Sequence, residues 1–381
     1  MIRVLLISHT CQSRTEGQPK AELLAAIPDI DLRVLVPDCW KHYGKWRTAD
    51  VPADSSLFEV GRVRLPWAGP AQFYLHYYPR LARLLTDFRP DVIDLWEEPW
   101  GLVSAHTCRL RNRLLPKTRI VSETEQNLNR QLPPPFEWFR KYTLSQADFL
   151  VGRSREAVQV ACAKGYKGHS ATVPNAVDTQ LFRPLDRAEC RRLLGWPQDV
   201  FIAGYVGRMV ERKGITDLLD AAAMCASEIK VAFVGNGPMD GVIGERGQSS
   251  ELQHRVLALP EKPLVELPAV MNALDVMVLP SRTVPTWKEQ FGRVIIESHA
   301  CGVPVIGSDS GAIPEVVENG GIIFHEGNIA ELACALNAMH RDVGLRDSMG
   351  RIGFRQVTDH YTWQCVAERM ADIYRHCVTA N

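Results

Sequence analysis

Short, uninterrupted apolar runs recur along the first half of this chain, with stretches of helical length between them. The runs lack the alternation of a half-exposed strand, which predicts strands covered on both faces. Two of the intervening stretches, 19–26 and 77–88, suit helices. Strands that alternate with helices predict a parallel, doubly wound α/β sheet. The predicted strands are Arg3–Ile7, Leu32–Val36, Asp91–Leu95, Arg119–Val121 and Phe149–Val151.

The same pattern begins again after residue 200, which predicts a second sheet with strands at 201–206, 230–234, 275–279 and 303–306. Residues 165–184, rich in Gly, Pro and Asn, are interpreted as the domain boundary. We expect two Rossmann-like domains, 1–170 and 185–361, and a C-terminal helix, 362–381, that packs back toward the first domain. Such domains are expected to face a central cleft, because doubly wound sheets bind ligands at the carboxyl ends of their strands.

Composition excludes several classes of protein. Lys plus Arg and Asp plus Glu number 44 each, so the chain lacks the basic excess of a nucleic-acid-binding protein. It has no apolar run of about 18 residues, which a transmembrane helix needs, and residues 1–9 become polar too soon for a signal peptide. The ten cysteines are scattered without metal-ligand spacing. We therefore expect a cytoplasmic protein with no nucleic-acid partner.

The phosphate-binding fingerprints of common nucleotide enzymes are missing. The best candidate for a dinucleotide motif, Gly235–Asp240, has Asp in place of the third Gly and contains a Pro. No Walker lysine motif is present. An NAD-dependent or P-loop enzyme is therefore disfavoured.

A basic loop follows the first strand of the second domain. Arg208 and Lys213 lie between the end of the strand 201–206 and a helix expected from about residue 215. Arginine can fork onto phosphate oxygens, lysine supplies a point charge, and the free N–H groups of a helix N-terminus add positive potential. Taken alone, the same residues also suit a solvated surface loop.

Two glutamates, Glu289 and Glu297, lie eight residues apart near a predicted helix start at Gly292. A helical path over that interval spans about 12 Å. This roughly matches the distance between the sugar and the ribose of a nucleoside-diphosphate sugar folded over a helix N-terminus. The carboxylates would then accept hydrogen bonds from hydroxyl groups at both ends. A capping acid and an ion-pair partner remain the alternative interpretation.

Several segments of the second half together resemble retaining glycosyltransferases of family 4. They include Glu289-x7-Glu297, the G-R-x4-K-G run at 207–214, Leu279-Pro280-Ser281, 300–305 (ACGVPV) and 311–315 (GAIPE). Residues 173–178 (VPNAVD) resemble the interdomain segment of that family. The resemblance implies a GT-B fold and transfer of a hexose, with retention, from a nucleoside-diphosphate sugar to a hydroxyl acceptor in polysaccharide or glycolipid biosynthesis. With it we expect no bound metal and no cofactor, the nucleotide sugar being a substrate.

The resemblance also implies roles for individual residues of the second domain. Arg208 and Lys213 match the pair that binds the diphosphate, Glu289 the residue that contacts the donor sugar, and Glu297 the ribose-binding residue. Arg208, Lys213 and Glu289 are the expected catalytic residues. The expected donor-binding residues are Glu297, Phe291, Gly292, Gly207 and Gly237.

The first half departs from the family pattern. The histidine of a T-x-H motif is missing from 121–127, where Glu125 or Asn127 would take its place, and the loop 9–18 contains a single glycine instead of a Gly-Gly pair. Glu97 and Glu98 follow a predicted strand and lie between two tryptophans that could stack on sugar rings. We assign Glu97, Glu98, Glu125 and Asn127 to the acceptor side.

A basic cluster of Arg109, Arg111, Arg113, Lys117 and Arg119 precedes the aromatic and basic segment 136–141. Such a face could rest on anionic lipid at the inner surface of the membrane, which would suit a lipid-linked acceptor rather than a free saccharide. A solvated helix face is the other interpretation. Two further hypotheses of function stay open: an epimerase or hydrolase that shares the donor site, and a catalytically silent protein that binds sugar nucleotides.

Overall fold

The computed structural model describes residues 1–42, 45–52, 55–64 and 72–379. The chain divides into two compact units. Unit 1 comprises Met1–Pro174 and Trp363–Asn381, and unit 2 comprises Asn175–Thr362.

Within the described residues, unit 1 contains a seven-stranded parallel sheet in the order β5-β2-β1-β6-β7-β8-β9. Its strands are β1 (Ile2–Ile7), β2 (Ile30–Pro37), β5 (Phe58–Gly61), β6 (Val92–Leu95), β7 (Arg119–Thr124), β8 (Phe149–Gly152) and β9 (His169–Thr172). An antiparallel hairpin of β3 (Cys39–His42) and β4 (Lys45–Thr48) follows β2. The helices are η1 (Thr10–Gln12), α1 (Gln18–Ala25), α2 (Gln72–Leu75), α3 (Leu81–Phe88), α4 (Leu102–Leu114), α5 (Phe136–Gln146), α6 (Arg155–Ala163) and α15 (Trp363–Thr379).

Within the described residues, unit 2 contains a six-stranded parallel sheet in the order β12-β11-β10-β13-β14-β15. The strands are β10 (Phe201–Val206), β11 (Ile229–Val234), β12 (Val256–Leu259), β13 (Val276–Leu279), β14 (Val305–Ser308) and β15 (Gly321–Phe324). Its helices are α7 (Arg187–Leu194), η2 (Glu211–Lys213), α8 (Ile215–Ala223), α9 (Asp240–Arg246), η3 (Leu264–Glu266), α10 (Leu267–Ala273), α11 (Arg293–Ala300), α12 (Ile313–Val317), α13 (Ile329–Arg341) and α14 (Val343–His360).

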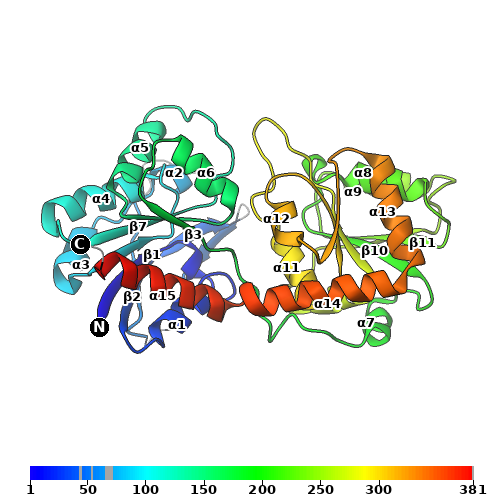
Figure 1. The fold of residues 1–381 in the computed structure, drawn as a ribbon, viewed down its shortest axis with the longest axis horizontal. Coiled ribbons are helices and arrows are strands. Elements are labelled where there is room, and N and C mark those ends of the chain that lie inside the picture. Colours follow the sequence, from blue (N-terminus) through cyan, green and yellow to red (C-terminus); the bar gives the residue numbers. More distant parts are fainter. Residues whose placement is uncertain (43–44, 53–54, 65–71, 380–381) are drawn as a thin grey trace. The chain divides into compact units, whose positions relative to one another are not determined.

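The central strands are buried along their whole length, as the continuous apolar runs require. Every residue of β6, β10, β13 and β14 is buried. Helices cover the sheets (Figure 1), and each fully buried Val, Leu or Ile side chain contributes about 1.5–3 kcal/mol to the free energy of unfolding. The parallel sheets covered by helices confirm the predicted doubly wound α/β class.

The last helix, α15, packs on unit 1 although it follows unit 2 in the sequence. It lies alongside α1 (Figure 1). Its Tyr374 hydroxyl donates a hydrogen bond of 2.6 Å to Asp94 at the buried end of β6, and Arg375 pairs with Asp29 at 2.7 Å. The helix therefore contributes to the stability of unit 1.

Two local predictions differ from the structure. The stretch 165–184 is not a linker throughout, because β9 lies inside it and pairs with β8 before the units divide after Pro174. This strand has no fully buried residue, so it lacks the apolar run by which strands are recognised. The helix expected over 77–88 begins only at Leu81, because the backbone of Tyr77 pairs with Arg64 in an isolated bridge.

Candidate functional site

The basic loop of unit 2 follows β10 and is held close to the end of β13. Gly214, with φ of 70°, is the N-cap of α8, and a Cβ atom there would lie 1.9 Å from the carbonyl oxygen of Pro280. Only glycine fits a left-handed conformation at so close an approach. The Tyr205 hydroxyl donates a hydrogen bond of 2.8 Å to the carbonyl of Arg208, whose side chain is exposed. The loop therefore presents Arg208 to solvent on a firmly held backbone.

Lys213 and Glu289, which are 76 residues apart in the sequence, form an ion pair. The Lys213 ammonium donates a hydrogen bond of 2.5 Å to Oε2 of Glu289. The buried Ser281 hydroxyl donates a second hydrogen bond, of 2.9 Å, to the same oxygen. Glu289 is 7% exposed, so its carboxylate is oriented by charge and by hydrogen bonding in a mostly dry environment.

An indole ring adjoins the basic loop. The Lys213 ammonium lies 4.8 Å from the centre of the Trp287 ring, and the Arg212 guanidinium lies 4.9 Å from it. Both distances suit cation–π attraction. Sequence reasoning missed Trp287, although an aromatic residue two positions before Glu289 was a signal that could have found it.

Glu289 and Glu297 are not joined by one helix. Gly292, with φ of 81°, is the N-cap, and α11 begins at Arg293, so only the last four residue steps to Glu297 are helical. Those steps span about 6 Å. The predicted helix start at Gly292 is confirmed, and the span of about 12 Å for a fully helical path does not apply, because Glu289 precedes the helix. Phe291 is 4% exposed and lies directly before the N-cap.

Glu297 projects from α11 and is partly buried. Burial raises the pKa of the Glu297 carboxyl, and the neighbouring Arg293 opposes that rise. Hydroxyl groups can hydrogen-bond to either form of a carboxyl group, so this environment is compatible with binding of a sugar or ribose.

Gly207 and Gly237 have a clear packing role. A Cβ atom at Gly237 would lie 2.2 Å from the carbonyl oxygen of Met209, and one at Gly235 would lie 1.9 Å from that of Gly207. The loops after β10 and β11 therefore touch through their backbones. The amide of Gly237 donates to both carboxylate oxygens of Asp240 at 3.0 Å, so this N–H group already has protein partners.

In unit 1 the neighbouring residues Glu97 and Glu98 have different surroundings. Glu98 accepts hydrogen bonds of 2.7 Å from the Thr124 hydroxyl and from the backbone amide of Glu125. Burial raises the pKa of the Glu98 carboxyl to about 7, against the effect of those hydrogen bonds. Glu97 instead accepts hydrogen bonds from His9. Burial alone would raise the pKa of Glu97, but His9 and His76 more than offset it, so the pKa is lowered.

The two residues assigned to the acceptor side after β7 also differ. The Glu125 side chain is 42% exposed and lies 3.8 Å from Nε of Arg153. Asn127 is 2% exposed. Glu125 is thus the more accessible of the two to a ligand.

Sequence reasoning missed a buried charged cluster at the ends of β6, β7 and β8. The Lys20 ammonium donates a hydrogen bond of 2.6 Å to Glu123 and lies 3.7 Å from Asp94, and Arg153 also pairs with Glu123. Burial raises the pKa of the Asp94 carboxyl to about 8. These side chains are at most 2% exposed, so the cluster joins α1 to three strands rather than facing solvent.

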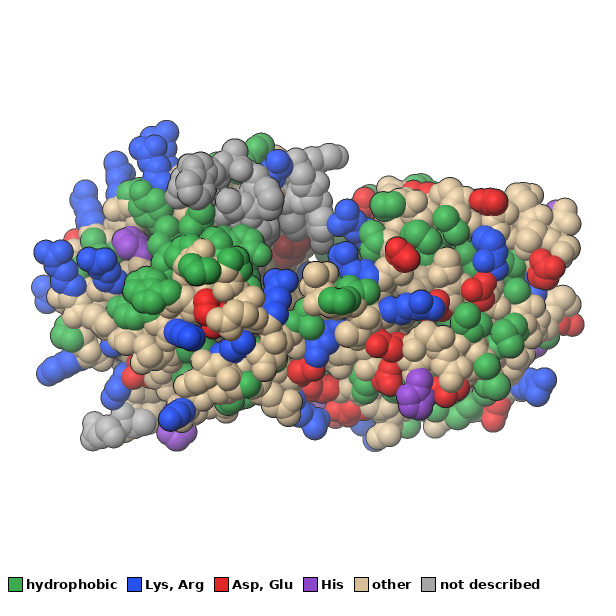
Figure 2. Space-filling model, turned by 90° about the horizontal axis from the view of Figure 1, so that it is seen from above, with side chains coloured by type: hydrophobic (Ala, Val, Ile, Leu, Met, Phe, Trp, Pro, Cys, Tyr) green, Lys and Arg blue, Asp and Glu red, His purple; other side chains and the backbone are tan. Residues whose placement is uncertain are grey.

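Some side chains of the predicted basic cluster and of the segment 136–141 form hydrogen bonds and ion pairs with other residues of the protein. Arg111 donates a hydrogen bond to the carbonyl of Gln146, Arg119 pairs with Asp148, and the buried Arg140 pairs with Glu137. The side chains that are exposed are Arg109, Arg113, Lys117, Lys141 and Trp138. Figure 2 shows Lys and Arg side chains gathered beside a hydrophobic area in unit 1, at the left of the view.

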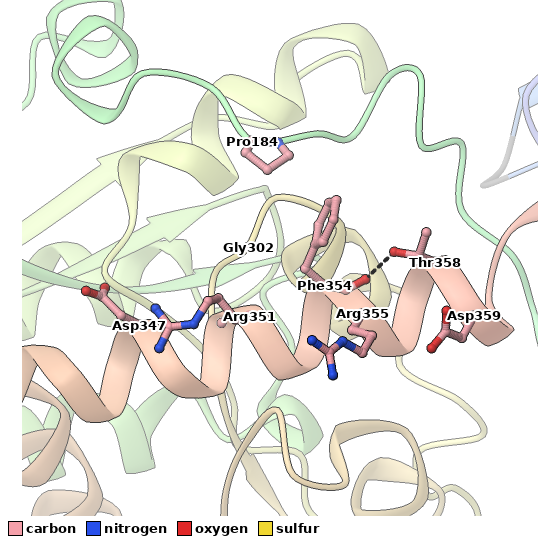
Figure 3. Close-up of a pocket in the computed structure, with 9 residues that line it drawn as sticks. Pro184, Gly302, Asp347, Arg351, Phe354, Arg355, Thr358 and Asp359 are labelled. Atoms are coloured by element: carbon pink, nitrogen blue, oxygen red, sulfur yellow. Dashed lines mark hydrogen bonds between the residues drawn. The ribbon is translucent and has the colours of Figure 1, made fainter.

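A cavity of about 580 Å³ lies along α14 in unit 2 (Figure 3). Pro184 and Phe354 face one another across it, and Arg351 and Arg355 project from the helix. None of the residues that the sequence assigns to the donor site lines this cavity. Among the described residues, no group of three or more His, Cys, Asp or Glu could hold a metal ion, and no helix is long and apolar enough to cross a membrane.

Comparison with known families finds a match in each half of the chain. The model described as Glycosyltransferase Family 4 matches residues 30–181, and the model described as Glycosyl transferases group 1 matches residues 186–356. Together the two models match most of units 1 and 2.

Two curated relatives are named D-inositol 3-phosphate glycosyltransferase. The protein from Catenulispora acidiphila is 31% identical over 252 residues, which are 62% of this chain and 59% of the relative. The one from Corynebacterium jeikeium is 29% identical over 308 residues, which are 76% of this chain and 69% of the relative. The chain thus spans about six- to seven-tenths of the length of these relatives.

Solved structures with the same fold cover the whole chain. Sucrose-phosphate synthase from Thermosynechococcus elongatus has a TM-score of 0.74 at 22% identity, with all of both chains covered. HepE from Anabaena, solved in complex with UDP, has a TM-score of 0.74 at 19% identity and covers 98% of this chain and 100% of its own. These likenesses confirm the predicted GT-B fold.

Proposed function

This chain belongs to the glycosyltransferases described by the group 1 and family 4 models, and from that membership we propose that it transfers a hexose from a nucleoside-diphosphate sugar to a hydroxyl acceptor. The transfer retains the anomeric configuration and needs no metal ion. The observation that carries the proposal is the ion pair of Lys213 and Glu289, formed by the loop that also presents the exposed Arg208.

Arg208 and Lys213 bind the diphosphate of the donor. Two cationic side chains offset the two negative charges of a diphosphate, and the charge that develops on it as the sugar leaves is stabilised in the same way. Because these cations are part of the chain, the role usually filled by a divalent metal ion is supplied by the protein.

Glu289 and Glu297 bind the two ends of the donor. A carboxylate accepts hydrogen bonds only, so it suits sugar hydroxyl groups and repels phosphate. The contacts of Glu289 with Lys213 and Ser281 hold its carboxylate in one orientation, which suits the donor sugar. Glu297 then binds the ribose, and the backbone around Phe291 and Gly292, at the N-terminus of α11, supplies N–H groups to the donor.

The acceptor binds to unit 1 and is a polyhydroxylated molecule, either a saccharide or a lipid-linked one. The name of the relative from Catenulispora acidiphila contains an inositol phosphate, and that of the solved structure from Thermosynechococcus elongatus contains sucrose phosphate. Both names support a polyhydroxylated ring as the acceptor. Its oxygen forms a bond to the anomeric carbon of the donor while the bond from that carbon to the diphosphate breaks. Glu97, Glu98, Glu125 and Asn127 are the acceptor-side residues, with Glu125 the most open to a ligand.

A transfer assay tests this function. The protein is incubated with the glucose conjugates of UDP, GDP, ADP and TDP, a panel of sugar and polyol acceptors, and either EDTA or buffer. We expect a glycosylated product in EDTA, with the anomeric configuration retained by NMR, and its loss in Lys213→Ala. Free sugar as the sole product would identify a hydrolase. Nucleotide binding without turnover of any donor would identify a silent binding protein.

We further propose that the protein is cytoplasmic and contacts the inner face of the membrane. The exposed Arg109 and Arg113 lie on α4, which packs against α5, and α5 carries the exposed Lys141 and the 60% exposed Trp138. Together with the exposed Lys117 after α4, they form a combination suited to anionic headgroups and the interface beneath them. Cosedimentation with phosphatidylglycerol vesicles should exceed that with phosphatidylcholine vesicles and fall in Trp138→Ala. Equal binding to both kinds of vesicle would contradict the proposal.

A further inference from the structure

His9, just after β1, is held by the carboxylate of Glu97, which lies just after the neighbouring strand β6. Its backbone amide donates a hydrogen bond of 2.7 Å to Oε1 of Glu97, and its Nδ1 lies 2.9 and 2.8 Å from the two carboxylate oxygens. Glu97 follows β6, which pairs with β1 in register, so the sheet itself brings the two residues together. This geometry places the Nδ1 proton toward Glu97.

Two aromatic rings complete the support of His9. The Trp40 ring stacks on the imidazole, with ring centres 4.7 Å apart and an angle of 22° between the planes. His76 packs edge-on against Trp40, and its Nε2 lies 3.8 Å from Oε1 of Glu97. The carboxylate side chain is 4% exposed, whereas the His9 side chain is 27% exposed. A fixed imidazole with a protected carboxylate behind it is the arrangement of a proton acceptor whose tautomer is set by its partner.

His9 forms part of the wall of a cavity of about 280 Å³ in unit 1. Gln12, Glu16, Arg47 and Asp50 also line it, so amide, carboxylate and guanidinium groups surround the space. Its volume is slightly below the range of about 300–1,000 Å³ for pockets that hold drug-sized ligands, which suits a single ring. Asp50 pairs with Arg14 at 3.3 Å, and Glu16 is matched in the wall by Arg47, so the lining has no excess of cations for an anionic ligand and suits a neutral one that is rich in hydroxyl groups.

The walls of this cavity are held in place by hydrogen bonds. The buried Gln18 side chain donates to the carbonyls of Cys11 and Asp50, at 3.1 and 2.7 Å. The amide of Asp50 donates to the carbonyl of Gln12 at 3.1 Å. The loop after β1 and the segment after β4 are thereby joined, so the cavity does not depend on a ligand for its shape.

We propose that this cavity binds a neutral, polyhydroxylated ring of the acceptor and that His9 is a catalytic residue that removes the proton of its reacting hydroxyl. The proposal rests on the transfer function above. In the step, the acceptor hydroxyl attacks the anomeric carbon from the face that the diphosphate leaves, so that the configuration is retained. Its proton passes to Nε2 of His9, the acceptor oxygen forms its bond to the anomeric carbon, and the electron pair of the breaking bond leaves with the diphosphate. Glu97 stabilises the imidazolium that results.

The charged groups around His9 set the pH at which it can act. Burial lowers the pKa of His9, but the facing carboxylates of Glu97, Glu125 and Glu16 more than offset this, so the pKa is raised above its usual value. Among the described residues, His76, the Arg47 and Asp50 side chains of the cavity, and Arg14, which pairs with Asp50, also bring charged or titratable groups to this region. Because only neutral imidazole accepts a proton, the rate should fall as the pH drops below the raised pKa.

The test compares the pH dependence of transfer in the wild type, His9→Asn and Glu97→Gln. We expect His9→Asn to lower kcat by about 10²- to 10⁴-fold and to abolish the acid limb of the profile. Glu97→Gln should move that limb to lower pH, because it removes the carboxylate that raises the pKa of His9. His106→Asn, which alters a histidine of α4 that does not line the cavity, should keep the limb.

Added imidazole provides a second measurement in His9→Ala, where it should restore part of the lost rate. Thermal shifts with the nucleoside diphosphate monitor unit 2 and should be the same in the wild type and the His9 variants. Transfer by His9→Asn within threefold of the wild type, with an unchanged acid limb, would overturn the role of His9. Absence of transfer by the wild type itself would instead overturn the proposed function.

Discussion

Replacing Lys213 with alanine removes the cation that contacts both the Glu289 carboxylate and the Trp287 ring. Glu289 is 7% exposed and would keep the hydrogen bond from Ser281 but lose its charged partner at 2.5 Å. A buried acceptor that loses a hydrogen bond costs about 1–3 kcal/mol, and the lost cation–π contact adds about 0.5–1 kcal/mol. Because the Lys213 side chain is 20% exposed, solvent screens part of the charge effect, and we expect a total loss of no more than about 1.5–4 kcal/mol.

A double-mutant cycle separates the pair from its surroundings. Urea denaturation of the wild type, Lys213→Ala, Glu289→Gln and the double variant should give a coupling energy of about 1–2 kcal/mol. In a thermal scan the single lysine variant should unfold about 5–15 °C lower, as expected for a domain of this size class. Arg208→Ala is the matched control, because its exposed side chain is expected to contribute to nucleotide affinity and little to stability. A coupling energy below about 0.5 kcal/mol would refute the view that the pair is formed and partly desolvated.

Three further changes test other parts of the structure. Trp287→Leu should lower kcat/KM for transfer about tenfold, while Trp287→Phe should keep most of it, because the face of the aromatic ring positions the basic loop. Equal losses of kcat/KM in the two variants, measured by steady-state kinetics, would contradict this role of the ring. Gly214→Ala should destabilise by more than about 2 kcal/mol in thermal unfolding, since its Cβ would lie 1.9 Å from the carbonyl of Pro280, whereas Gly241→Ala, with open space around it, should be near neutral. Glu98, whose pKa is raised to about 7, contributes stability below its ordinary pKa that is lost as the pH rises to about 7. The Tm of Glu98→Gln should therefore fall less between pH 5 and pH 8 than that of the wild type, and parallel Tm curves would contradict the raised pKa.

The central strands could be predicted because their signal, a continuous apolar run, lies in residues that are neighbours in the sequence. A continuous apolar run such as Phe201–Val206 has few ways to bury all its side chains other than as a central strand, and all six of its residues are buried. The edge strands β5, β9, β12 and β15 were missed because they contain intermediate or exposed positions and therefore carry a weak apolar signal.

The donor site was predictable in part. The order and spacing of Arg208, Lys213, Glu289 and Glu297 carried the family resemblance, and the family comparison confirms it. The helix start at Gly292 was predicted, whereas the path from Glu289 to Gly292 was not, because it depends on contacts such as that of Glu289 with Lys213, which is 76 positions away. Their roles in binding remain predictions that the assays above address.

The sequence by itself determined the class of fold, the presence of two doubly wound domains and the family. These depend on apolar periodicity and short motifs, which are formed by residues close together in the sequence. Tertiary structure alone decided which distant side chains meet. Lys213 reaches Glu289 across 76 positions, and His9 reaches Glu97 across 88. Such pairs form because parallel strands bring their carboxyl ends to one edge of a sheet, whatever their separation along the chain. Pairing of this kind leaves no local pattern, so it became visible only once strand order and register were known.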